Sequence, residues 1–135
     1  MLVGTDPFIR RARHLRKMLG GGMRQVGVLA AAGLVSLEKM TKRLGEDHAR
    51  ARKLAADLRE VDGLVVDQNS PYTNMVYLNV TDNVQTNAFE ITQKMKEHGV
   101  LVDPENPRRF RLVTHYLIDD PAVDQTVTAF RKSLN

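Results

Sequence analysis

The residues best suited to chemistry lie in the segment Lys17-Met18-Leu19-Gly20-Gly21-Gly22-Met23-Arg24-Gln25. Three consecutive glycines let the backbone approach a ligand closely, and they precede a predicted helix whose free amides attract anions. Lys17 and Arg24 add positive charge on either side. The segment therefore suits an anionic ligand, although its composition equally allows a flexible linker between two helices. It is not a nucleotide-binding loop, because its glycine spacing matches neither common pattern.

A second candidate is Arg111, in the apolar segment Phe110-Arg111-Leu112-Val113. An arginine is costly to bury unless it is paired, and its planar guanidinium suits a bidentate contact with a carboxylate. If this segment alternates as a strand, Arg111 points away from the side of Phe110 and Leu112. The alternative is a solvent-exposed arginine on an edge strand.

Other catalytic chemistries find no support in the sequence. The chain has no cysteine, which excludes disulfides, thiolate metal sites and cysteine nucleophiles. The four histidines, His14, His48, His98 and His115, have no partner at metal-ligand spacing. We therefore expect no metal site, and no serine triad or carboxylate pair can be argued from spacing.

The net charge of +4 is concentrated near the N-terminus. The first 25 residues include six basic residues and a single acidic residue, Asp6. Residues 10–17 could contact nucleic acid, but no DNA- or RNA-binding motif accompanies them, so a solvated or partner-facing surface is the favoured interpretation. The longest apolar run, residues 26–37, is shorter than the roughly 20 residues that span a bilayer. With no signal peptide in view, we expect a cytoplasmic protein without membrane contact.

The elements that must position these residues follow from periodicity. A capped helix is predicted over residues 6–19, and an apolar helix is predicted to begin at residue 23. We assign residues 1–40, which contain both helices, to the tail of a larger domain. Residues 41–135 are predicted to form a small α/β domain of order α-β-β-α-β-β-α, an open-faced sandwich with a largely antiparallel sheet. Its expected elements are helices at 37–61, 86–98 and from 119, and strands at 64–66, 75–80, 100–102 and 110–113, with a turn-rich loop at 103–107.

Several of these strings resemble the low-specificity L-threonine aldolases of the aromatic amino acid beta-eliminating lyase/threonine aldolase family. The most specific is Arg16-Lys17-Met18-Leu19-Gly20-Gly21-Gly22-Met23-Arg24-Gln25. Further matches are residues 27–34, Glu46-Asp47-His48, Thr73-Asn74-Met75 and Arg111-Leu112-Val113-Thr114-His115. The resemblance covers nearly the whole chain, and it corresponds to the C-terminal portion of the family.

The resemblance implies the fold type I, or aspartate-aminotransferase-like, architecture of pyridoxal phosphate (PLP) enzymes. Members of the threonine aldolase family cleave threonine or allo-threonine to glycine and acetaldehyde, with PLP as the electron sink, and are usually tetramers. By motif, Lys17 and Arg24 match basic residues around the cofactor phosphate and the active-site mouth. Arg111 matches the arginine that binds the substrate carboxylate.

The family's Schiff-base lysine lies in a Ser-x-x-Lys-Gly segment shortly before the stretch that matches Leu2-Val3-Gly4, so this sequence does not contain it. We therefore expect the family to be one of carbon–carbon lyases, and we expect these 135 residues alone to be inactive. The alternative is a non-enzymatic α/β module for interaction or dimerisation. Preference between L-threonine and L-allo-threonine does not follow from these residues.

Overall fold

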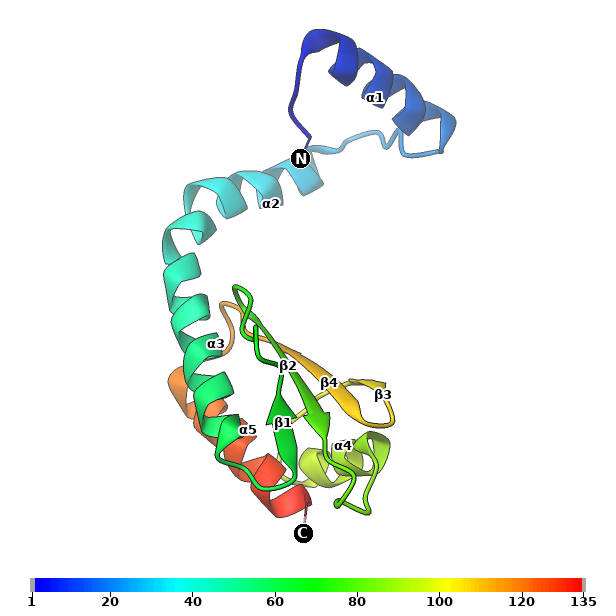
Figure 1. Ribbon diagram of the computed structural model, residues 1–135. Helices are drawn as coiled ribbons and strands as arrows, with labels where there is room; N and C mark the ends of the chain where they lie inside the picture. The colour runs from blue at the N-terminus through cyan, green and yellow to red at the C-terminus, as the bar shows by residue number, and fades with distance from the viewer. Residues whose placement is uncertain (1, 135) are drawn as a thin grey trace. The chain divides into compact units, whose positions relative to one another are not determined.

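A computed structural model describes residues 2–134 of the chain. The chain divides after Lys42 into two compact units, and each is considered by itself. The first unit contains α1 (Asp6–Met18) and α2 (Gly27–Glu38) (Figure 1). A short 3-10 helix, Met40–Arg43, spans the division.

The two helices of the first unit bury none of their residues. α1 begins after Thr5 with Asp6 and Pro7 in its first turn, where proline costs no hydrogen bond. The chain leaves this helix through Gly20, whose φ of +78° favours glycine. α2 is apolar on all sides, and Leu29 remains 61% exposed. A helix of this composition normally lies inside a larger body.

The second unit is a four-stranded antiparallel sheet with helices on one face (Figure 1). The sheet order is β1-β2-β4-β3, and the element order α-β-β-α-β-β-α is the predicted one. The elements are α3 (Leu44–Arg59), β1 (Leu64–Val66), β2 (Met75–Val80), α4 (Ala88–Glu97), β3 (Pro104–Asn106), β4 (Arg109–Val113) and α5 (Asp120–Ser133).

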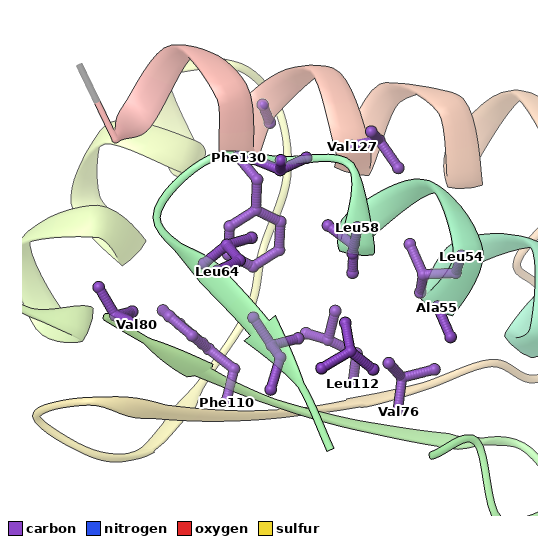
Figure 2. Packing of buried hydrophobic residues seen from close by; sticks show 14 of the residues in the cluster. Leu54, Ala55, Leu58, Leu64, Val76, Val80, Phe110, Leu112, Val127 and Phe130 are labelled. Carbon is purple, nitrogen blue, oxygen red and sulfur yellow. The ribbon is translucent and has the colours of Figure 1, made fainter. Parts of the chain in front are cut away.

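The core of this unit lies between the sheet and the helices α3 and α5 (Figure 2). β2 and β4 alternate, so that Val76 and Leu78 face the same side as Phe110 and Leu112. Phe130 of α5 meets Phe110 edge to face, with ring centroids 5.4 Å apart. Such aromatic pairs add to the free energy gained from burial.

Local signals explain where the helices of the second unit begin and end. The Asn87 side chain accepts hydrogen bonds from the Phe89 and Glu90 amides, and the Glu90 carboxylate accepts one from the Asn87 amide, which completes a capping box for α4. Asp119 caps α5 through the Ala122 amide at 2.9 Å. α4 is followed by Gly99 at a φ of +76°.

The prediction of a strand at residues 100–102 was wrong. The strand beside β4 is instead Pro104–Asn106, within the segment predicted to be a loop. Val100 and Val102 pack against the core as partly buried side chains, so their apolar pattern reflects packing and not strand pairing. The Asn106 side chain accepts a hydrogen bond from the Arg108 amide in the turn that connects β3 to β4.

Among residues 2–134, no helix combines the length and apolar character that crossing a membrane requires.

Candidate functional site

Arg111 lies on the face of the sheet opposite the helices of its unit. Its strand neighbours Phe110 and Leu112 are buried in the core, whereas the Arg111 side chain is 52% exposed. The alternation expected for this strand is therefore confirmed, and it points the guanidinium of Arg111 away from the core.

Arg109 lies on the same face, two residues before Arg111, and is held by several acceptors. Its Nη2 lies 2.6 Å from Asp67 Oδ2, its Nη1 lies 3.2 Å from Asn79 Oδ1, and its Nε lies 3.2 Å from Glu105 Oε2. Its guanidinium also lies over the Tyr77 ring, 5.2 Å from the centroid. The hydrogen bond to Asp67 is the main cause that raises the pKa of Arg109.

Arg111 has far weaker internal partners than Arg109. Its Nε lies 3.9 Å from Glu105 Oε1, which is an ion pair beyond hydrogen-bond distance. Within residues 2–134 no acceptor lies at hydrogen-bond distance from its terminal amino groups. Of the two arginines, Arg111 is therefore the one available to a carboxylate from outside.

Arg111 also lines a surface cavity of about 380 Å³ at the end of β4. Other lining residues come from the segment before β3, from the end of β4 and the loop after it, and from α5; they include Leu101, Asp103, Val113, His115 and Gln125. Residues 101–103 belong to no strand, and β3 begins only at Pro104, opposite Phe110. A small polar ligand could thus contact Arg111 and the cavity together.

Three of the sequence motifs meet at the end of β4. The buried Thr114 donates its hydroxyl to the Asp47 carbonyl at 2.7 Å and its amide to the Asn74 carbonyl at 3.0 Å. Asn74 Nδ2 donates in turn to the Thr114 carbonyl at 2.7 Å. These bonds fix the end of the strand that carries Arg111 against α3 and the turn before β2.

Lys17 and Arg24 flank the glycine loop of the first unit, as the sequence requires. The Lys17 side chain folds over Gly22, where a β-carbon would lie 2.9 Å from Lys17 Nζ. A larger residue at position 22 would displace this ammonium group. No side chain caps the start of α2, so its first amides are open to an acceptor. These features suit a phosphate group.

The predicted site residues belong to different units, Lys17 and Arg24 to the first and Arg111 to the second. Sequence reasoning missed Glu105 and Tyr77, which lie beside Arg111, and Arg109 and Asp67, which pair with each other on the same sheet face. The period-two alternation of β4 was the available signal, because it places Arg109 and Arg111 on the same side. Among the described residues, no group of three or more metal-ligating side chains is gathered.

The beta-eliminating lyase family profile matches residues 1–83. The chain is 40% identical over 132 residues to the "Probable low-specificity L-threonine aldolase 2" of Arabidopsis thaliana, covering 98% of this chain and 37% of that protein. It is 43% identical over 115 residues to the "Low specificity L-threonine aldolase" of Escherichia coli (strain K12), covering 85% of this chain and 32% of the relative. The chain thus spans about a third of the length of these relatives.

Solved structures of aminotransferases share the fold. Ornithine delta-aminotransferase of Plasmodium falciparum matches with a TM-score of 0.52 and 16% identity, over 70% of this chain and 25% of that one. The ornithine aminotransferase of Toxoplasma gondii matches with a TM-score of 0.52 and 22% identity, over 74% and 25% of the two chains. The likeness confirms the expected aspartate-aminotransferase-like architecture.

Proposed function

Since the chain belongs to the beta-eliminating lyase family, we propose that it forms the C-terminal part of a PLP-dependent threonine aldolase. The reaction would be cleavage of L-threonine or L-allo-threonine to glycine and acetaldehyde. The observation that carries the proposal is Arg111, an exposed guanidinium beside a cavity, with terminal amino groups open to a ligand. The named relatives in Arabidopsis and Escherichia coli support the substrate class.

Arg111 would hold the carboxylate of the amino-acid substrate. Two parallel N–H···O bonds from one guanidinium fix both the position and the plane of a carboxylate. This orientation matters because it determines which bond at the α-carbon is presented for cleavage. Thr114 and Asn74 support the arrangement by fixing the end of β4.

The glycine loop and its two cations would hold the phosphate of PLP. Lys17, Arg24 and the uncapped amides at the start of α2 supply the charges and donors that a phosphate requires. When bound, PLP supplies an electron sink for breaking the carbon–carbon bond. We propose that these 135 residues alone do not catalyse the reaction, because the Schiff-base lysine that the resemblance implies lies outside them.

The resemblance further implies a homo-oligomer, a tetramer in the family, acting in the cytoplasm. We propose both for the complete protein.

The test is a chimera in which these 135 residues replace the segment they match in the Arabidopsis relative. We expect it to release acetaldehyde from L-threonine in the presence of PLP. Arg111→Ala should lower kcat/KM by about 10- to 150-fold, because hydrogen bonds to charged groups contribute about 1.5–3 kcal/mol. Arg52→Ala, an exposed arginine of α3 away from the cavity, is the matched control and should leave kcat/KM unchanged.

Two outcomes would contradict the proposal. The first is a chimera whose kcat/KM is the same with and without Arg111. The second concerns the 135 residues alone: acetaldehyde release above a control with PLP only would show that they catalyse the reaction unaided.

The exposed apolar residues of α1 and α2 favour a second candidate, an interaction or dimerisation module without catalysis. Leu15, Leu29 and Leu34 each remain between 44% and 61% exposed within the described chain. A module of this kind would associate through these helices and leave the chimera inactive with L-threonine. The chimera assay therefore separates the two functions.

A further inference from the structure

Glu105 is shared between the two arginines of the open sheet face. Its Oε2 accepts a hydrogen bond from Arg109 Nε at 3.2 Å, and its Oε1 lies 3.9 Å from Arg111 Nε. The side chain of Glu105 is 35% exposed. One carboxylate therefore lies beside the guanidinium that a ligand would use.

The carboxylate of Glu105 cannot readily move away, because Arg109 holds it from the other side. Arg109 is itself held by Asp67 and Asn79 and lies over the Tyr77 ring. This network places a fixed negative charge at the Nε edge of Arg111. The edge formed by the two terminal amino groups stays open for one incoming carboxylate.

We propose that Glu105 is a specificity-determining residue of the Arg111 site, which favours ligands with one carboxylate over ligands with two. The inference rests on the proposed role of Arg111 in binding a carboxylate. The first carboxylate of a ligand is attracted by Arg111, whereas a second carboxylate close to Glu105 is repelled. Like charges about 4 Å apart in a water-exposed site change affinity by roughly fivefold.

A purely structural role for Glu105 makes a different prediction. If Glu105 only joined β3 to β4, its removal would affect stability and would change the binding of all carboxylates equally. The ratio of affinities for a monocarboxylate and a dicarboxylate therefore distinguishes the two roles.

The experiment uses the 135-residue chain labelled with ¹⁵N, and butyrate and succinate as ligands. These have the same four-carbon length and differ in one terminal carboxylate. The Nε–H resonance of Arg111, assigned by its loss in Arg111→Lys, reports binding at constant ionic strength. We expect Glu105→Gln to raise the affinity for succinate relative to butyrate by about fivefold.

Three variants complete the design. Glu105→Asp keeps the charge and should keep the ratio within about twofold of the natural chain. Glu60→Gln removes an exposed carboxylate at the end of α3 and should also leave the ratio unchanged. Glu105→Ser repeats the charge removal and takes the place of Glu105→Gln if that variant loses its dispersed amide spectrum.

The outcomes are separable from those of the proposed function. If both ligands shift the Arg111 resonance and charge removal leaves their affinity ratio unchanged, the inference about Glu105 is overturned while the role of Arg111 stands. If neither ligand shifts the Arg111 resonance in the natural chain, the carboxylate role of Arg111 fails, and the specificity role of Glu105 fails with it.

Discussion

At the scale of single residues, Arg109 and Arg111 show how position within one strand separates two chemically identical side chains. Arg109 donates hydrogen bonds to Asp67, Asn79 and Glu105, and the two carboxylates balance its positive charge. Arg111 retains one distant ion pair. All three guanidinium nitrogens of Arg109 donate hydrogen bonds, whereas those of Arg111 donate none to residues 2–134, and this difference directs the proposed carboxylate site to Arg111.

Thr114 is the residue on which the end of β4 most depends. Removing its buried hydroxyl deletes one hydrogen bond to the Asp47 carbonyl, which keeps its donor within α3, and the loss of one such bond costs about 0.5–1.5 kcal/mol. We expect Thr114→Val to lower the free energy of unfolding by that amount in urea denaturation. Thr128→Val is the control, because the Thr128 hydroxyl is exposed and bonds within its own helix. Equal unfolding free energies for the two variants would contradict the assigned role.

At the scale of elements, ion pairs link the outer surfaces of α3 and α5. Arg50 Nε lies 3.0 Å from Asp120 Oδ1, and Lys53 pairs with both Asp124 and Asp57. The hydrogen bonds to Asp124 and Asp57 raise the pKa of Lys53. The Lys53 side chain is 43% exposed, so water screens these pairs and their contribution to stability is small.

Lys53→Met should therefore lower the free energy of unfolding by less than about 1 kcal/mol. Because the folded-state pKa is raised, the contribution is complete below the unfolded pKa of about 10.4 and is lost only as pH rises through the folded value. The difference from the natural chain should stay constant between about pH 6 and 9 and shrink in about 1 M salt.

The measurement is urea denaturation at several pH values, with Arg52→Met on the same helix as the control. The control removes an exposed cation of α3 that forms no ion pair with any of residues 2–134. A Lys53→Met effect that grows steadily from pH 6 to 9 would contradict the sign of the shift.

At the scale of the whole molecule, the two units differ in whether they bury a core. The second unit encloses Leu58, Leu78, Phe110 and Phe130 completely. The helices α1 and α2 bury no residue. Extended exposed apolar surface of this kind drives association. The second unit therefore has what independent folding requires, and the first unit does not.

We expect residues 43–135 alone to be monomeric in light scattering and to unfold cooperatively in urea. The 135-residue chain should associate at the same concentration, because it also presents α2. A matched chain with Val28→Glu and Leu34→Glu should associate less. A non-cooperative transition for residues 43–135 would show that their core is insufficient.

The order of helices and strands in the second unit could be predicted because its signals are local. Spacing of three and four residues defines α3, alternation defines β2 and β4, and Asp119 with Pro121 marks the start of α5. The third strand could not be placed this way. Val100 and Val102 carry an apolar pattern because they touch the core, whereas strand pairing at Pro104–Asn106 depends on the turn into β4.

The succession of helices and strands, the glycine loop with Lys17 and Arg24, and the outward direction of Arg111 in an alternating strand could all be predicted from the sequence, because each depends on neighbouring residues. Which arginine is neutralised could not be predicted, since Asp67 reaches Arg109 across 42 positions. Likewise, Thr114 meets Asp47 across 67 positions. Such contacts arise from the packing of strands and helices, and no local pattern encodes the charge that a distant segment brings to a site.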